Sequence, residues 1–317
     1  MKHFSALLLA VTLILPAALR AQTTNCAVPG TDNAFLGIHT VRLWAGPAPE
    51  AKGDTCDDIP ALTIFGPRQG AANGSAVLIL PGGAYAHLAG DLEGREVADW
   101  FTSRGFIAFI LSYRLTSHGY VLPVPLLDAR RAVQTVRARA MDYHINPNRI
   151  VVIGFSAGGH LAALAGTQFV PGKPDADDPI DRVSSRPDYL VLGYPWLGAI
   201  TTDTSHLSYC KIFNLMDQCD ALRAKYDPDL FVTKDTPPTF IYHTFNDRTV
   251  PIEQSVEFYQ ALIKAGVPSE YHVFANGAHG SGLGKGDLSL EAWPMLLENW
   301  LRAQGLITVD KDAVGAK

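Results

Sequence analysis

The feature that most constrains the fold of this chain is the segment at residues 151–160, VVIGFSAGGH. A short apolar run rich in β-branched residues leads into the pattern G-x-S-x-G, and a helix of small residues is predicted to follow. A serine on such a sharp turn needs small residues two positions before and two positions after it, because the strand and the helix pack closely there. Gly154 and Gly158 meet that need. Ser156 is therefore predicted to lie at the apex of a nucleophile elbow.

Segments with strand character alternate with helical segments along the rest of the chain. The uninterrupted apolar run at residues 75–80 is typical of a strand covered on both faces, and residues 125–143 carry apolar side chains at helical spacing. Two strands at residues 38–44 and 61–65 are predicted to pair as an antiparallel edge. This order predicts an α/β fold with a mostly parallel central sheet and helices on both faces.

The chain is predicted to form one large domain between two short terminal segments. Residues 1–21 have a basic start, an apolar stretch and small residues for cleavage, which indicates a secretory signal peptide and export to the periplasm or the medium. Residues 22–308 are predicted as the α/β domain and residues 309–317 as a loose tail. An insertion at about residues 197–235 is expected to form a small lid over the sheet edge. A surface excursion without substrate contact is the alternative for this insertion.

An exported chain with four cysteines is expected to form two disulfides. Three pairings are open, and the pairing of Cys26 with Cys56 and of Cys210 with Cys219 is favoured because each bridge closes a local loop. The sequence has no C-x-x-C or H-x-x-x-H spacing, so no metal site is predicted. With 31 acidic and 26 basic side chains and no basic tract, neither nucleic acid nor a membrane surface is expected as a partner. The sequence gives no indication of the oligomeric state.

Two later residues are predicted to complete a catalytic triad with Ser156. A serine hydroxyl is a weak nucleophile, so it needs a base and a carboxylate that orients the base. In the expected sheet the acid and then the histidine follow the serine, each in a loop after a strand. Asp247 and His279 stand in such loops. His206 in the insertion is the main alternative base, and the other histidines considered stand in less suitable positions (His160, His243 and His272).

Acyl chemistry also needs backbone amides that stabilise a negatively charged oxygen. Ala157 supplies one amide because it directly follows the nucleophile, and the loop PGGAY at residues 81–85 is placed to supply the second from Gly83 or Ala84. This loop lacks the G-x-G-x-x-G and Gly-Lys-Thr patterns of phosphate-binding loops, and no cofactor is predicted.

Substrate contacts are predicted from residues near these loops. Tyr85 and Trp196 are expected to line the mouth of the site, since aromatic faces stack on sugar rings or acyl groups. The polar residues after the loop at residues 81–85 are candidates to bind sugar hydroxyls (Asp91, Glu93 and Arg95). A structural role is the open alternative for all five.

Taken together, these segments resemble the α/β-hydrolase superfamily, and within it the secreted bacterial carbohydrate esterases of the acetyl-xylan and feruloyl esterase type. The resemblance covers residues 41–306 and is carried by segments such as PGGAYAHLAGDLEGREVADWF, NRIVVIGFSAGGHLAA and FNDRTVPIEQSVEFYQALIKAGVPSEYHVFANGAHG. It implies that Ser156, Asp247 and His279 are nucleophile, acid and base. It also implies a serine esterase that acts on short-chain or aromatic acyl esters through an acyl-enzyme. Ala84 departs from the superfamily pattern, in which a third glycine is common.

Two other functions stay open. A serine exopeptidase of the same fold uses the same triad, but such peptidases usually carry a large further domain. A catalytically inactive α/β-hydrolase could serve as a binding module, although inactive members usually lack a triad residue. The predicted partner of the esterase is a small-molecule or polysaccharide ester.

Overall fold

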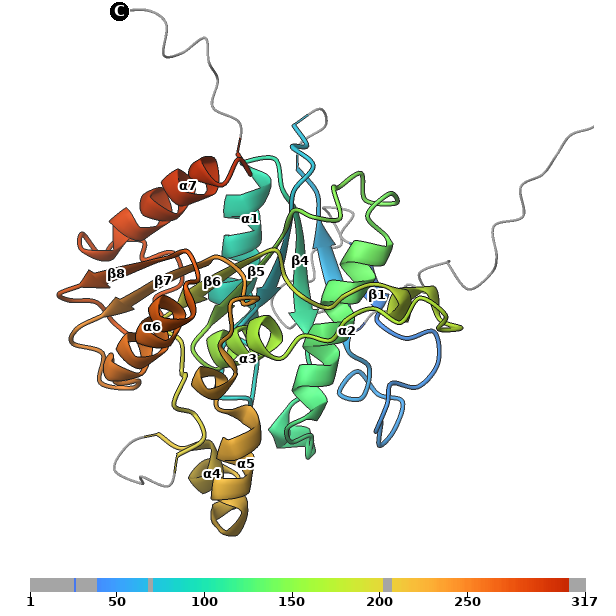
Figure 1. The fold of residues 1–317 in the computed structure, drawn as a ribbon, viewed down its shortest axis with the longest axis horizontal. Helices are drawn as coiled ribbons and strands as arrows, with labels where there is room; N and C mark the ends of the chain where they lie inside the picture. Colours follow the sequence, from blue (N-terminus) through green and yellow to red (C-terminus); the bar gives the residue numbers. More distant parts are fainter. Residues whose placement is uncertain (1–25, 27–38, 68–70, 202–206, 308–317) are drawn as a thin grey trace, which may run out of the picture.

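The computed structural model describes residue 26 and residues 39–67, 71–201 and 207–307. These residues form an eight-stranded sheet with the strand order β1-β2-β4-β3-β5-β6-β7-β8 (Figure 1). β2 is antiparallel to both of its neighbours, and all other neighbouring strands are parallel. The predicted α/β fold and its antiparallel edge are thus confirmed. The strands are β1 (His39–Arg42), β2 (Ala61–Phe65), β3 (Ala76–Leu80), β4 (Ile107–Ser112), β5 (Ile150–Phe155), β6 (Tyr189–Gly193), β7 (Thr239–Thr244) and β8 (Ser269–Phe274).

Helices cover both faces of the sheet, and each layer encloses its own core. One core joins sheet side chains to α2, α3 and α6, and the other joins the opposite face to α1 and α7. β3 and β5 are buried along their whole length, which explains why they appear in the sequence as uninterrupted apolar runs. These helices are α1 (Glu96–Thr102), α2 (Val124–Ala138), α3 (Ala157–Thr167), α6 (Glu253–Ala265) and α7 (Trp293–Ala303).

Two helices are shorter than the sequence predicted. The helix expected to reach residue 143 ends at Ala138, and the chain then turns through His144, whose φ of 54° no right-handed helix can continue. The sequence also favours a helix over roughly residues 94–104, and in the structure this helix begins at Glu96, after a π-helical turn over Gly90–Arg95, and ends at Thr102. This turn carries Glu93 into the protein interior, where it is 3% exposed.

Both predicted disulfides are present, Cys26–Cys56 and Cys210–Cys219. The second joins two short helices of the insertion, α4 (Tyr209–Ile212) and α5 (Cys219–Tyr226), and both of its cysteines are buried in the core under α3. Residues 202–206 of the insertion lie outside the described residues, as do the predicted signal peptide and the predicted tail. The role of the insertion as a lid stays a prediction.

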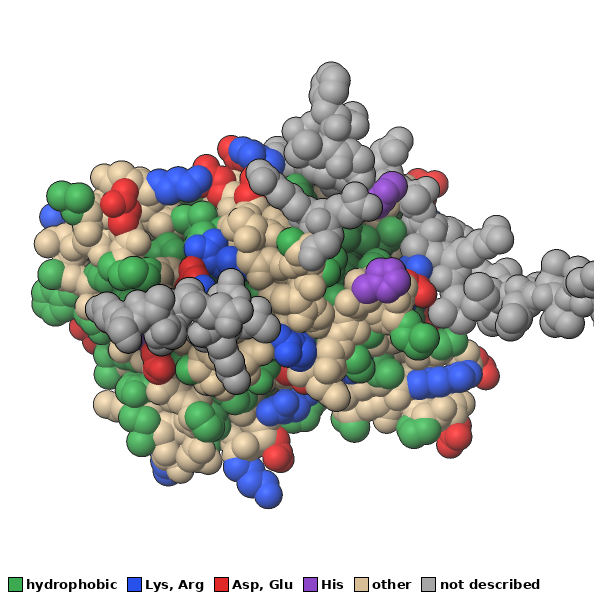
Figure 2. All heavy atoms as spheres, turned by 90° about the horizontal axis from the view of Figure 1, so that it is seen from above, with side chains coloured by type: hydrophobic (Ala, Val, Ile, Leu, Met, Phe, Trp, Pro, Cys, Tyr) green, Lys and Arg blue, Asp and Glu red, His purple; other side chains and the backbone are tan. Residues whose placement is uncertain are grey.

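The described surface mixes charges of both signs. On the face shown in Figure 2, Lys and Arg side chains are interspersed with Asp, Glu and apolar side chains. This agrees with a composition in which 31 acidic and 26 basic side chains nearly balance. None of the helices in the described ranges is long and apolar enough to cross a membrane.

A buried ion pair ties α2 to the end of β4. Arg114 and Asp128 have side chains that are 1% and 0% exposed, and Arg114 Nη2 lies 2.6 Å from Asp128 Oδ1. The Nε and the amide nitrogen of Arg114 both donate to Asp128 Oδ2 at 3.0 Å. Arg114 also donates to the carbonyl of Pro49 at 2.6 Å. The Asp128 carboxylate accepts hydrogen bonds at both oxygens and balances the charge of Arg114. Removing the negative charge would leave the buried guanidinium without a counter-charge.

We expect Asp128→Asn to lower the free energy of unfolding by about 3–5 kcal/mol, since a buried charge then loses its partner. Asp142→Asn is the matched control, because Asp142 is 47% exposed and pairs with Arg139 at the surface. That control should change the free energy of unfolding by less than about 1 kcal/mol. Urea titration of both variants measures the difference, and equal effects would contradict the prediction.

Candidate active site

Ser156 lies between the end of β5 and the first residue of α3 with a φ of 51° and a ψ of −119°. A residue with a side chain adopts this conformation only when its surroundings enforce it. A Cβ atom on Gly154 would lie 2.1 Å from the carbonyl oxygen of Gly158, and one on Gly158 would lie 2.1 Å from the carbonyl oxygen of Leu80. The Ser156 amide donates to the carbonyl of Gly193 at 3.1 Å. Only glycine fits at positions 154 and 158. Together with the hydrogen bond to the neighbouring strand, these close contacts hold the predicted elbow in place.

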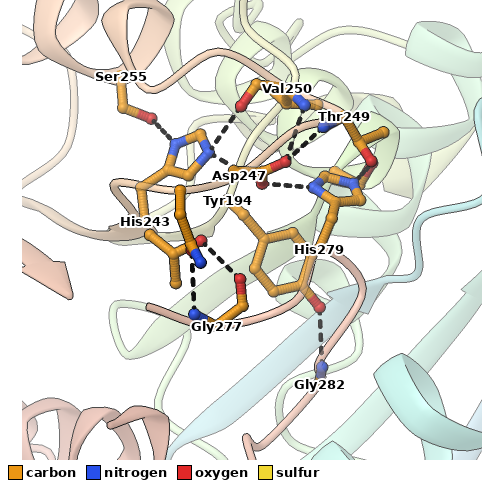
Figure 3. A network of polar contacts seen from close by, with 12 residues as sticks. Tyr194, His243, Asp247, Thr249, Val250, Ser255, Gly277, His279 and Gly282 are labelled. Atoms are coloured by element: carbon orange, nitrogen blue, oxygen red, sulfur yellow. Dashed lines mark hydrogen bonds and ion pairs between the residues drawn. The ribbon is translucent and has the colours of Figure 1, made fainter. Parts of the chain in front are cut away.

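The structure brings Ser156, Asp247 and His279 together. His279 Nε2 lies 2.8 Å from Ser156 Oγ. On the other side of the ring, His279 Nδ1 lies 2.7 Å from Asp247 Oδ2 (Figure 3). Asp247 follows β7 and His279 follows β8, so both loops arise at the sheet edge that also carries the elbow. Since the three side chains form one continuous chain of hydrogen bonds, the imidazole is placed to accept the serine proton while facing the carboxylate.

A second histidine, His243, holds Asp247 from the other side. His243 lies in β7, is fully buried, and places Nε2 3.2 Å from Asp247 Oδ2. Its Nδ1 lies 2.8 Å from Ser255 Oγ, so both ring nitrogens are engaged (Figure 3). From the sequence alone, His243 stands only among the alternative bases. The sequence feature that could have indicated this supporting role is the position of His243 near the end of its strand, four residues before Asp247.

The carboxylate of Asp247 receives hydrogen bonds at both oxygens. Oδ1 accepts from the amides of Thr249 at 2.8 Å and Val250 at 2.9 Å, while Oδ2 faces the two imidazoles. Burial by itself raises the pKa of a carboxyl group. The hydrogen bonds from His243, His279 and Val250 outweigh burial and hold the pKa of Asp247 below its usual range. Asp247 is therefore ionised at neutral pH.

The loop after β3 has an unusual backbone. Gly83, Ala84 and Tyr85 have consecutive φ values of 128°, 53° and 62°. A Cβ atom on Gly83 would lie 2.2 Å from the carbonyl oxygen of His87, so only glycine fits there. Ala84 occupies a left-handed conformation that favours glycine, at the position where the superfamily pattern often has one. The loop is thus strained beside the predicted site.

The predicted oxyanion donors have amides available to a ligand. Among the described residues, the amides of Gly83, Ala84 and Ala157 have no hydrogen-bond acceptor. The loop lies directly against the nucleophile, because a Cβ atom on Gly82 would lie 3.0 Å from Ser156 Cβ. Stabilisation of a tetrahedral intermediate requires backbone amides that are held beside the serine. The assignment of these three donors stays a prediction.

Tyr85 and Trp196 do not line the mouth of the site, and this prediction was wrong. Both side chains are 0% exposed. The Tyr85 hydroxyl lies 2.8 Å from His160 Nδ1, and His160 Nε2 faces the carbonyl of Tyr226 at 2.9 Å. The Trp196 indole donates to the carbonyl of Leu207 at 3.3 Å. Both rings pack in the core under α3, where no sugar ring or acyl group can stack on them.

Glu93 does not bind substrate hydroxyls either. Its Oε2 accepts from the amide of Gly82 at 2.7 Å, and its Oε1 accepts from the hydroxyl of Tyr194 at 2.7 Å. Asp91 and Arg95 instead pair with each other at the surface, with Arg95 Nε 2.8 Å from Asp91 Oδ1. The cause of this difference is the π-helical turn over Gly90–Arg95, which sequence propensity does not reveal. In the described ranges, no group of three or more His, Cys, Asp or Glu side chains is arranged to hold a metal ion.

An elbow serine at the end of a central strand, followed by an acid and a histidine on an eight-stranded and mostly parallel sheet, defines the α/β-hydrolase fold. The BD-FAE family model matches residues 62–182, and the Prolyl oligopeptidase family model matches residues 201–304. The two matches divide between them the strands that carry the serine and those that carry the acid and the histidine.

Solved and curated relatives narrow the class. The chain is 36% identical, with a TM-score of 0.74, to an acetyl ester-xyloside bifunctional hydrolase from Caldicellulosiruptor lactoaceticus, over 85% of this chain and 97% of that one. It is 33% identical over 68% of its length to endo-1,4-beta-xylanase B from Butyrivibrio fibrisolvens, and 29% identical over 73% to an acetylxylan esterase from Xylanibacter ruminicola. The chain spans only 35% and 46% of the length of these two curated relatives. The chain belongs to the carbohydrate esterases of the α/β-hydrolase superfamily.

The low pKa of Asp247 predicts how stability depends on pH. A carboxyl group with a folded-state pKa below its unfolded value stabilises the fold above the unfolded pKa of about 3.9, and this contribution is lost as the pH falls through the folded pKa. We expect the wild type to lose about 1 kcal/mol of its free energy of unfolding relative to Asp247→Asn between pH 5 and pH 3. Urea titrations of both proteins at the two pH values measure this change. A difference that stays constant or grows would contradict the prediction.

Proposed function

We propose that this chain is a serine esterase that hydrolyses short-chain or aromatic acyl esters, such as acetyl or feruloyl esters, on plant cell-wall carbohydrate. The observation that carries the proposal is the placement of His279 Nε2 at 2.8 Å from Ser156 Oγ, with Nδ1 at 2.7 Å from Asp247. The substrate class is supported by relatives whose names are acetylxylan esterase and acetyl ester-xyloside hydrolase. The small size of the insertion helices, four and eight residues, also favours short acyl groups over long lipids.

In the proposed reaction, His279 Nε2 takes the proton of Ser156 as the serine oxygen attacks the ester carbonyl carbon. Asp247 orients the imidazole and stabilises its positive charge. The amide of Ala157, with that of Gly83 or Ala84, binds the oxyanion. His279 then donates its proton to the departing alcohol, and the acyl group stays on the serine. Water enters, gives a proton to His279, and attacks the acyl carbon; the acid leaves as the proton returns to Ser156 Oγ.

We propose further that residues 1–21 are removed on export, and that the mature protein forms one domain over residues 22–308 with the insertion as a small lid and residues 309–317 as a loose tail. Two disulfides in the structure support an oxidising compartment such as the periplasm or the medium. The interspersed surface charges in Figure 2 favour a small-molecule or polysaccharide ester as the partner over nucleic acid.

Ser156→Ala should lower kcat for p-nitrophenyl acetate by about 10⁴-fold or more, since the proposed nucleophile is lost. Ser103→Ala is the matched control, because Ser103 is exposed and its hydroxyl contacts the carbonyl of Trp100 and the guanidinium of Arg104, away from Ser156. The control should retain wild-type kcat. Labelling by a fluorophosphonate should disappear in Ser156→Ala alone, and substantial turnover by that variant would refute the proposed nucleophile.

A substrate panel separates the esterase from a serine peptidase, the second candidate. The peptidase is favoured only by the match of residues 201–304 to the Prolyl oligopeptidase family. We expect release of acetate from acetylated xylan or of ferulate from feruloyl esters, and no cleavage of peptide p-nitroanilides, because the described domain offers no second unit to select peptides. Acid release is measured by titration or chromatography. Faster cleavage of peptides than of any ester would reverse the assignment.

A further inference from the structure

We propose that Glu93 and Tyr194 are positioning residues that hold the oxyanion loop and the His279 loop in register with Ser156. The inference rests on the proposed ester hydrolysis and assigns to these two residues a role that the triad alone does not require. Neither side chain is accessible to substrate, because Glu93 is 3% and Tyr194 is 1% exposed. They act through the backbone and the ring that they contact.

One end of the bridge is the oxyanion loop. Glu93 Oε2 accepts the amide proton of Gly82 at 2.7 Å. Gly82 contacts the nucleophile, since a Cβ atom there would lie 3.0 Å from Ser156 Cβ and 2.7 Å from Glu93 Oε2. Gly83 and Ala84, the predicted donors, follow directly. Glu93 thus determines where the loop begins its strained turn.

The other end of the bridge is the loop that carries His279. The hydroxyl of Tyr194 donates to Glu93 Oε1 at 2.7 Å and accepts from the amide of Gly282 at 2.9 Å. The ring of Tyr194 lies edge-on to the imidazole of His279, with centroids 4.9 Å apart. Figure 3 shows the Tyr194 ring beside His279 with its hydroxyl directed at Gly282. The tyrosine therefore restrains both the ring and the backbone of the histidine loop.

The Gly282 end is itself anchored. The carbonyl of Gly282 accepts from the hydroxyl of Tyr242 at 3.0 Å and from the indole of Trp293 at 3.2 Å. Tyr242 and Trp293 stack with ring centroids 4.1 Å apart. The bridge thus runs from the loop after β3, through Glu93 and Tyr194, to Gly282, which is hydrogen-bonded to side chains of β7 and α7.

Both oxygens of Glu93 receive donors, which suits an ionised carboxylate. Burial raises the pKa of Glu93, and the hydrogen bonds from Tyr194 and Gly82 oppose that rise. The oxygen of Tyr194 accepts the amide proton of Gly282, so the hydroxyl proton of Tyr194 points toward Glu93. Replacing Glu93 with glutamine keeps the shape but leaves one of these hydrogen bonds without a proper partner.

The test measures kcat, KM and the rate of fluorophosphonate labelling in Glu93→Gln, Tyr194→Phe and the double variant, all normalised to titrated active sites. We expect each single variant to lower kcat and the labelling rate on the order of 10-fold with KM nearly unchanged, because misplaced groups weaken the transition state more than substrate binding. If the two residues act as one bridge, the double variant should lose little more than Tyr194→Phe alone. Independent roles would instead multiply to a loss of about 100-fold, and that result would overturn the proposal.

Tyr143→Phe is the control, since the Tyr143 hydroxyl is buried without a hydrogen-bond partner and the ring packs against Phe109. It should retain wild-type kcat. Full kcat per titrated site in Glu93→Gln and Tyr194→Phe, with only a lower melting temperature, would show a merely structural role and overturn the proposal. A wild type that neither turns over esters nor labels at Ser156 would instead overturn the proposed function, and the inference with it.

Discussion

The close approach of three backbone segments at the elbow is the constraint on which the rest of the structure depends. Gly154, Gly158 and the last carbonyl of β3 pack without intervening side chains, so the path of β5 into α3 determines where the serine stands. A methyl group at either glycine would overlap a carbonyl oxygen. The neighbours of β5 in the sheet, β3 and β6, then supply the loop at residues 81–85 and the acceptor for the Ser156 amide. The position of Ser156 is therefore a property of the sheet rather than of one side chain.

Around that serine, buried polar groups support the surrounding residues through further hydrogen bonds. His243 supports Asp247, Glu93 supports Gly82, and His160 binds the hydroxyl of Tyr85. Burial lowers the pKa of His160 to about 4, which keeps the ring neutral. A neutral ring can accept from the tyrosine while donating to a carbonyl of the insertion. Each of these groups has its partners, so the networks make the site rigid instead of leaving unpaired polar atoms in a low-dielectric interior.

Sequence patterns predicted the sheet, the elbow, both disulfides and the loops that carry Asp247 and His279, because each rests on a local rule such as apolar periodicity, glycine spacing or a turn after a strand. They failed for side chains whose direction depends on contacts between distant segments. Tyr85 is the last of three consecutive residues with positive φ angles, which turn it into the core, and Glu93 enters the interior only through a π-helical turn. His243 looked like a rival base because its partner Ser255 lies on another element. The end of α2 was also predicted too late. The apolar pattern of a helix continues to residue 143, but the positive φ of His144 turns the chain.

Two buried carboxylates near one histidine are difficult to explain by stability alone. Removing a charge from water costs several kcal/mol, and apolar replacements of buried ionic groups are often neutral or stabilising. Asp247 offsets its burial with four donors and faces the imidazole directly, so its charge is available to the chemistry. Glu93 has only two donors and reaches His279 through Tyr194. Its benefit therefore lies in geometry: a short side chain with two acceptor oxygens can join a loop amide and a tyrosine hydroxyl, and an apolar residue of the same volume could join neither.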